Sequence, residues 1–215
     1  MSPFQYIADH WDTLGPEVVT QLELPLLAVA LAAIVGVAMG VLGARDERVD
    51  ALFTAINSTL LTVPSFALFG ILVFYVGTGN LAVVIGLALY SLLPVQRNTT
   101  AGIRAVRAEV VEAARGMGMS ALQILWRIEL PLSLPVIIAG LRQAVVSAVA
   151  ICTIGAAYNS DNLGRPILDV LRSENLTALT ATVLLIVVIG LTADGILAAV
   201  QRVLSRGRIT RVQAA

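Results

Sequence analysis

The part of this sequence most able to act on something outside the chain is a polar segment that reads VEAARGMGMSALQILWRIELP at positions 111–131. A helix is predicted over Val106–Arg115. Gly116 and Gly118 interrupt it, because glycine weakens a helix and adopts positive φ without steric cost. The segment is therefore expected to form a compact, partly apolar projection, whose function would be recognition rather than bond making.

A second short helix is expected directly after the glycines. Ser120 can cap it, and its expected range is Ala121–Arg127. Pro131 is expected to end it, since proline lacks the N–H that a helix interior needs. Two interpretations of this helix–turn–helix stay open. It either binds another protein or packs on its own chain through its large apolar side chains, which are Met117, Met119, Leu122 and Trp126.

Charged residues inside the apolar stretches form a second candidate set. Arg142, followed by Gln143, and Asp194 lie where a charge in a membrane needs a partner or a water-filled cavity. Arg142 is therefore either a gate or pathway residue, or a side chain that reaches the interface or pairs with a neighbouring helix. Asp194 is a candidate partner for it, and so is a second chain.

A third set is a run of hydroxyl and amide side chains around a proline. Its pathway candidates are Asn57, Thr62, Pro64 and Ser65. Such a stripe suits the wall of a water-filled pathway, where irregular backbone is tolerated. Hydrogen bonding between helices explains the same residues almost as well.

The remaining composition excludes several kinds of chemistry. All 14 basic residues are arginine, so the chain has no lysine for a phosphate-binding P-loop or a Schiff base. One cysteine allows no intrachain disulfide, and one histidine allows no histidine-based metal cluster. An intramembrane enzyme would need a convergent set of catalytic groups, yet Asp194 is the only acid inside a predicted span. The formal net charge of zero gives no basic field for nucleic acid.

Composition also sets the elements that must position these residues. The 215 residues are 58% hydrophobic and 13% charged, with a mean hydropathy of +0.88, whereas soluble domains are about 25% charged. We therefore expect an all-α, polytopic transmembrane bundle. Stretches near the length of a bilayer predict five spans, at residues 24–44, 51–76, 81–96, 132–157 and 176–200. Small residues spaced by four in the first span predict close helix packing, at Ala32, Gly36, Gly40 and Ala44.

The arginines predict the orientation of these spans. With the N-terminus outside, eleven arginines fall in cytoplasmic segments and two fall outside, which follows the positive-inside rule. The expected organisation is an external segment over residues 1–23, a transmembrane domain over 24–205 with a cytoplasmic loop at 97–130, and a cytoplasmic tail over 206–215.

The polar segment also resembles a known family. Its residues reproduce the EAA signature of binding-protein-dependent ABC importer permeases, which is EAA, three residues, glycine, nine residues and I-x-L-P. The matching residues are Glu112, Ala113, Ala114, Gly118, Ile128, Leu130 and Pro131. Flanking residues resemble the branch that takes up glycine betaine, choline and carnitine, at Thr62–Ser65, Leu93-Pro94, Arg97–Thr99 and Ala139–Arg142. The stretch IGAAYNSDNLG at 154–164 departs from the glycine-rich stretch usual in the family.

The resemblance implies a type I ABC importer permease in a bacterial inner membrane. Two permease chains, identical or paralogous, would form the pathway with cytoplasmic ATPase subunits and an external substrate-binding protein. ATP and Mg²⁺ would bind to the ATPase subunits and no cofactor to this chain. Glu112 would contact the ATPase or brace the loop, and Gly118, with Gly116, would form the turn. Uptake of an amino acid or another small solute, and an ATPase-independent channel or carrier, are the alternatives.

Overall fold

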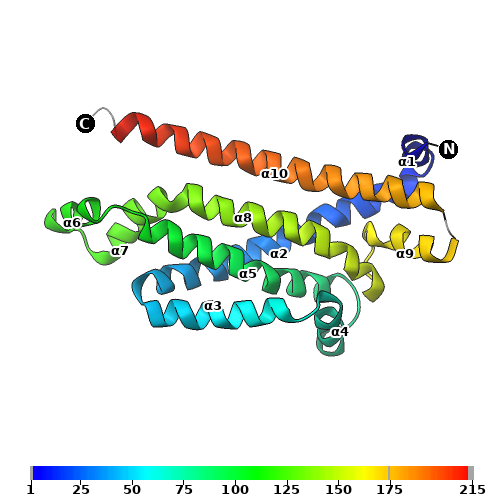
Figure 1. The fold of residues 1–215 in the computed structure, drawn as a ribbon, viewed down its shortest axis with the longest axis horizontal. Coiled ribbons are helices and arrows are strands. Elements are labelled where there is room, and N and C mark those ends of the chain that lie inside the picture. Colours follow the sequence, from blue (N-terminus) through cyan, green and yellow to red (C-terminus); the bar gives the residue numbers. More distant parts are fainter. Residues whose placement is uncertain (1, 174, 213–215) are drawn as a thin grey trace.

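The chain is a bundle of helices in a computed structural model that describes residues 2–173 and 175–212, with only the backbone described for 171–173 and 206–212. Every regular element of the described residues is helical, which confirms the predicted fold class. Long helices run along one axis, with short helices at both ends (Figure 1). The elements are α1 (Pro3–Asp9), α2 (Trp11–Arg45), α3 (Glu47–Thr62), α4 (Ser65–Val76), α5 (Asn80–Arg104), α6 (Ala108–Gly116), α7 (Ala121–Ile124), a π-helical turn (Leu125–Glu129), α8 (Leu130–Cys152), a 3₁₀ helix (Thr153–Tyr158), α9 (Gly164–Ser173) and α10 (Leu176–Val212).

Helices α2, α5 and α8 form the centre of the bundle. The stripe of small residues on α2 lets α5 approach closely. A Cβ added to Gly36 would lie 2.9 Å from Val95 Cγ1, and one added to Gly40 would overlap Thr99. The expected close packing along this stripe is therefore confirmed. Helix α10 packs mainly on α8 and leaves most of its large apolar side chains exposed, among those that the structure describes.

The predicted second span, residues 51–76, is divided into two helices. Helices α3 and α4 meet at an angle of 98°. Pro64 disfavours helical backbone at the residue before it, and Val63 is accordingly extended at ψ 127°. The Tyr90 hydroxyl donates to the Val63 carbonyl at 2.7 Å, so the break leaves that carbonyl satisfied. The bend is therefore stabilised by a specific side-chain hydrogen bond from α5.

Three of the other predicted spans are longer in the structure, whereas α8 ends at Cys152 and the end of the predicted span at 132–157 is a 3₁₀ helix. Within the described residues, four helices are long and apolar enough to cross a membrane, and the bent pair makes a fifth if it is one span. Helix α2 begins at Trp11 rather than Leu24, so part of the predicted external segment is helical and continuous with the first span. Helix α5 continues to Arg104, through the start of the predicted loop at residues 97–130. Helix α10 reaches Val212; the last residues of the predicted tail, 213–215, lie outside the described residues.

Candidate functional site

The predicted recognition segment lies at one end of the bundle. Helices α6 and α7 extend beyond the long helices there, opposite the end that carries α1 and α9 (Figure 1). We call residues 105–129, which connect α5 to α8, the projection. Both helices that enter and leave it are long, so the projection is joined directly to two candidate spans.

The turn of the projection depends on Gly118. This residue has φ +82°, whereas Gly116 is the last residue of α6 and has no positive φ. The Gly118 N–H donates to the Arg115 carbonyl at 3.0 Å, and the Met119 N–H donates to the Ala114 carbonyl at 3.2 Å. These two bonds form a Schellman motif with Gly118 at the left-handed position. The turn therefore requires glycine at 118 and does not require it at 116.

The second helix begins as predicted and ends differently. Ser120 Oγ accepts a hydrogen bond from the Gln123 N–H, and Gln123 Oε1 accepts one from the Ser120 N–H, which makes a capping box. The prediction that Pro131 ends this helix is wrong. The backbone widens into a π-helical turn in which the Leu130 N–H donates to the Leu125 carbonyl. Pro131 then occupies the first turn of α8, where a missing N–H is tolerated, so the helical path continues into the span.

The projection exposes large apolar side chains. Met117, Leu122 and Trp126 are 75%, 65% and 64% exposed, while Met119 is half-buried. A shallow groove of about 480 Å³ is lined by Met117 together with Ala113 and Ile128. Exposed apolar surface of this kind is typical of sites that bind another protein or a membrane. These three side chains do not pack against the rest of the chain, which was the alternative interpretation.

The residues of the EAA signature have different surroundings in the structure. Ala114 is buried under the turn, whereas Glu112 and Ala113 are exposed on α6. The Glu112 carboxylate has no hydrogen bond or ion pair with another described residue. Leu130 and Pro131, by contrast, are half-buried at the start of α8. Glu112 is therefore available to a partner, while Leu130 and Pro131 join the projection to the span.

An ion pair that the sequence analysis missed fixes the base of the projection. Glu129 lies between two residues of the signature and is 3% exposed. Its carboxylate accepts hydrogen bonds from both terminal nitrogens of Arg45. Arg45 Nη1 donates to Glu129 Oε1 at 2.9 Å. A bidentate pair with a buried carboxylate is geometrically specific and is costly to break. An acid inside an apolar motif, and an arginine at the end of a span, were the signals available in the sequence.

The polar residues of the predicted second span lie in different surroundings in the structure. Asn57 is buried and donates to Gln96 Oε1 of α5 at 2.8 Å, so it is a contact between helices in this conformation. Exposed Thr62 donates to the carbonyl of Thr59 within its own helix at 2.7 Å. Thr62, Pro64 and Ser65 lie together at the bend between α3 and α4.

Polar residues near Asn57 form a network with α5. Asp50 Oδ1 accepts hydrogen bonds from Gln96 Nε2 and Thr100 Oγ1, both at 3.2 Å. Arg104 completes the cluster through an ion pair with Asp50 at 3.3 Å and a hydrogen bond to the Gly43 carbonyl at 2.8 Å. This cluster, absent from the predicted site, ties α3 and α5 together close to the projection.

Arg142 is paired, as one of the two interpretations expected. Its Nε and Nη2 donate to the two carboxylate oxygens of Asp194, each at 2.9 Å, and its Nη1 donates to Gln201 Oε1 at 2.8 Å. Gln201 Nε2 in turn donates to the Pro135 carbonyl at 2.9 Å. The pair joins α8 to α10 and lines an open groove of about 670 Å³, together with the exposed side chain of Gln143.

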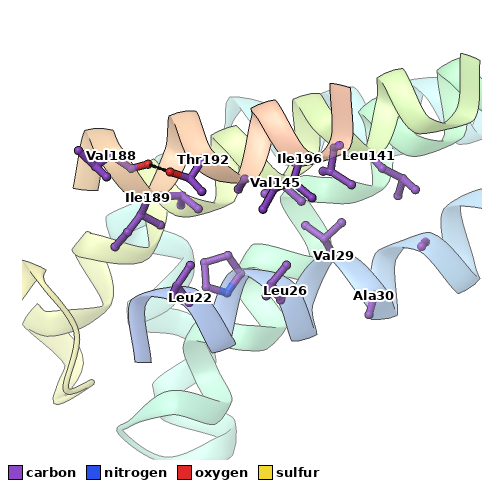
Figure 2. A pocket seen from close by; sticks show the side chains of 15 residues that line it. Leu22, Leu26, Val29, Ala30, Leu141, Val145, Val188, Ile189, Thr192 and Ile196 are labelled. Atoms are coloured by element: carbon purple, nitrogen blue, oxygen red, sulfur yellow. Dashed lines mark hydrogen bonds between the residues drawn. The ribbon is translucent and has the colours of Figure 1, made fainter. Parts of the chain in front are cut away.

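A second groove between the long helices has a different chemistry. It measures about 530 Å³ and lies between α2, α8 and α10 (Figure 2). Its lining includes Leu22, Val145 and Ile196, and its one hydroxyl, on Thr192, donates to the Val188 carbonyl at 2.7 Å. No charged side chain lines it, so it offers nothing to orient a charged solute.

Comparison with known proteins agrees with this arrangement. Residues 21–207 match the family described as "Binding-protein-dependent transport system inner membrane component". The chain is 39% identical, over 161 residues, to the glycine betaine/carnitine/choline transport system permease protein OpuCD of Bacillus subtilis, covering 75% of this chain and 69% of that protein. It is 39% identical, over 204 residues, to the choline transport system permease protein OpuBD of the same organism, covering 93% and 89%. The osmoprotectant import permease protein OsmW of Salmonella typhimurium is 35% identical over 210 residues, covering 95% and 98%.

Solved structures share the fold at low sequence identity. A chain of the inward-facing MetNI methionine ABC transporter superposes with a TM-score of 0.79 at 18% identity, covering 91% of this chain and 98% of that one. A chain of an amino acid ABC transporter superposes with a TM-score of 0.71 at 20% identity, covering 93% and 97%. The arrangement of helices in Figure 1 is therefore that of ABC transporter membrane chains.

Proposed function

Because the chain belongs to the family of binding-protein-dependent transport system inner membrane components, we propose that it forms the translocation pathway of an ATP-driven osmoprotectant importer. The proposed substrates are small solutes such as glycine betaine, choline or carnitine, which are named for relatives 39% identical to this chain. The relatives that match most of this chain support the same class of solute.

One structural observation carries the proposed coupling to an ATPase. The exposed apolar side chains of Met117, Leu122 and Trp126 project from one end of the bundle on a turn built around Gly118. A convex apolar projection suits a groove on a partner subunit. We propose that this partner is a cytoplasmic ATPase that binds ATP and Mg²⁺, since the chain has no lysine for a phosphate-binding loop.

The projection would then lie on the cytoplasmic side of the membrane. Arginines concentrate at this end of the bundle, as in the projection itself and at Arg45 and Arg48. The N-terminus would face outwards, where an external substrate-binding protein delivers the solute, and the C-terminus would face the cytoplasm. Arg172, Arg206, Arg208 and Arg211, which belong to the same count of charges, have side chains outside the described residues.

A second permease chain, identical or paralogous, completes the proposed pathway. Gln143 and Ser147 are exposed on α8, where contact with lipid would leave their polar groups unsatisfied. Both line the groove that contains the Arg142–Asp194 pair. A water-filled interface with another chain would satisfy these groups, so we propose that this face of α8 borders the pathway.

The test of this function is reconstitution with candidate partners. The chain is coexpressed with an ABC ATPase, purified in detergent and reconstituted in vesicles with an external binding protein loaded with glycine betaine, choline or carnitine. We expect the ATPase to copurify, and ATP hydrolysis and uptake to rise when the loaded binding protein is added. Solute flux of the same size without any ATPase would contradict the proposal and identify a channel or carrier.

A further inference from the structure

A polar pocket lies at the end of the bundle opposite the projection, where α1, α9 and the beginnings of α2 and α10 meet. It has a volume of about 250 Å³. Apolar walls come from Leu14 and Val170, and the polar lining includes Tyr6, Glu17 and Arg165. In the proposed orientation this pocket faces the outside, where solute arrives.

Glu17 is the unusual member of this pocket. It is 7% exposed, and its Oε2 is buried without a hydrogen-bond partner. One helical turn further along α2, Gln21 donates to the Val149 carbonyl at 2.7 Å, while its own Oε1 is also buried and unpartnered. A buried carboxylate oxygen without a donor is unfavourable, because no described protein group replaces its lost solvation. A positively charged ligand in the pocket would remove this cost.

The other side chains of the pocket suit an organic cation. Tyr6 presents an aromatic ring that is half-buried and held in place by stacking on His10, with ring centroids 4.1 Å apart. Aromatic faces attract ammonium groups, and quaternary ammonium ions in particular are bound by such rings. The apolar walls at Leu14 and Val170 can contact methyl groups. An aromatic ring, a carboxylate and apolar walls are thus combined in one pocket.

The arginine in the lining does not neutralise Glu17 by direct contact. Arg165 Nη2 pairs with Asp161 Oδ1 at 2.5 Å, and Asp161 lies in the loop before α9. Its side chain is 46% exposed, so solvent screens its charge. Among the described side chains, no cation therefore pairs with the buried Glu17 carboxylate.

We propose that this pocket is an external binding site for the quaternary ammonium group of the transported solute, with Glu17 supplying the charge and Tyr6 the aromatic face. The identity of the solute rests on the proposed function, since glycine betaine, carnitine and choline share a trimethylammonium group. The site would hold the solute on this chain after release from the external binding protein.

The test uses the assembled transporter, without the external binding protein, in nanodiscs of phosphatidylglycerol, whose headgroup carries no ammonium group. Equilibrium dialysis with radiolabelled choline should show saturable binding that 3,3-dimethylbutan-1-ol, a neutral analogue of the same shape, does not displace. Glu17→Gln should weaken binding by at least about tenfold. Tyr6→Leu should weaken it by about 2- to 30-fold, while Tyr6→Phe keeps the ring and the affinity.

Glu23→Gln is the matched control, because Glu23 is an exposed acid of the same helix outside the pocket. Its choline affinity should equal that of the wild type. Equal binding by wild type and Glu17→Gln, or displacement of choline by the neutral analogue, would overturn the site. A second measurement distinguishes the proposed site from the proposed function. It is the ATP hydrolysis that choline-loaded binding protein stimulates in the same nanodiscs. Stimulation of the wild type supports the proposed function even if Glu17→Gln binds choline normally.

Discussion

Arg45 and Glu129 are 84 residues apart in the sequence and form a bidentate ion pair at the base of the projection. The Glu129 side chain is 4% exposed and that of Arg45 is 48% exposed, so the carboxylate depends on this one cation for its charge balance. The pair joins the end of α2 to the π-helical turn before α8. A force applied to the projection by a bound ATPase would therefore reach α2 as well as α8.

Breaking this pair should destabilise the chain and weaken coupling. Arg45→Met leaves the Glu129 carboxylate buried and unpaired, at a cost on the order of 2 kcal/mol in unfolding free energy, because Arg45 is half exposed. The double variant Arg45→Met/Glu129→Met should lose less than the sum of the single variants. Thermal unfolding in detergent and stimulated ATP hydrolysis measure both effects. Additive losses in the double variant would show that the pair contributes no coupling energy.

Substitution at Gly118 should impair coupling without preventing insertion. Gly118 has φ +82°, and a Cβ added there would contact nothing within 4 Å, so the penalty comes from the backbone alone. Gly118→Val should cost about 1–2 kcal/mol or more and reorient α7, lowering stimulated ATP hydrolysis and uptake together. Gly118→Asn should retain more activity, since asparagine tolerates this conformation.

Gly116→Ala is the control for this prediction. Gly116 has ordinary helical backbone and equally open surroundings, so alanine there should leave coupling intact. Full stimulation of ATP hydrolysis in Gly118→Val would show that the projection is a folded loop without a coupling function.

Loss of Glu112 should affect the partner rather than the chain itself. Its carboxylate is exposed and makes no contact with another described charged group, so Glu112→Ala should leave thermal stability unchanged. Removing a charged hydrogen-bond acceptor from the docking surface should weaken ATPase copurification and stimulation. Glu47→Ala, which removes another exposed acid at the same end of the bundle, is the control. Equal losses in the two variants would argue against a specific contact.

Removing one partner of the Arg142–Asp194 pair should impair the protein more than removing both. Arg142→Ala leaves Asp194 without the cation that holds both its oxygens, and lowered transport is expected. Arg142→Met/Asp194→Leu removes both charges and should assemble as the wild type does, which size-exclusion chromatography measures. Transport by the double variant then tests the pathway directly. Wild-type uptake by an assembled Arg142→Ala chain would leave Arg142 with a structural role alone.

The topology can be tested by labelling single cysteines. Thr78 and Arg115 are exposed at opposite ends of the bundle, while Cys152 is fully buried and can be replaced by alanine. In that background, a membrane-impermeant maleimide should label Thr78→Cys from outside intact cells. It should label Arg115→Cys only after the membrane is opened. The reverse pattern would overturn the N-out, C-in orientation.

Local patterns in the sequence were sufficient for much of this protein. Long apolar stretches predicted the helical membrane bundle, because a helix that crosses lipid must bury its backbone polar groups within itself. Gly116 and Gly118 predicted the turn of the projection, and Ser120 predicted the start of its second helix. These features depend on interactions between residues a few positions apart, which composition and spacing record directly.

Tertiary structure decided the contacts between distant segments. Asn57 could have lined a pathway or joined two helices, and only the approach of α5 with Gln96 resolved its role in this conformation. The partner of Glu129 and the surroundings of Glu17 were equally hidden, since a side chain's charge balance depends on which helices pack around it. Pro131 was misjudged for a related reason. A π-helical turn moves the hydrogen bonds by one residue, so a proline that would end a regular helix instead begins the next.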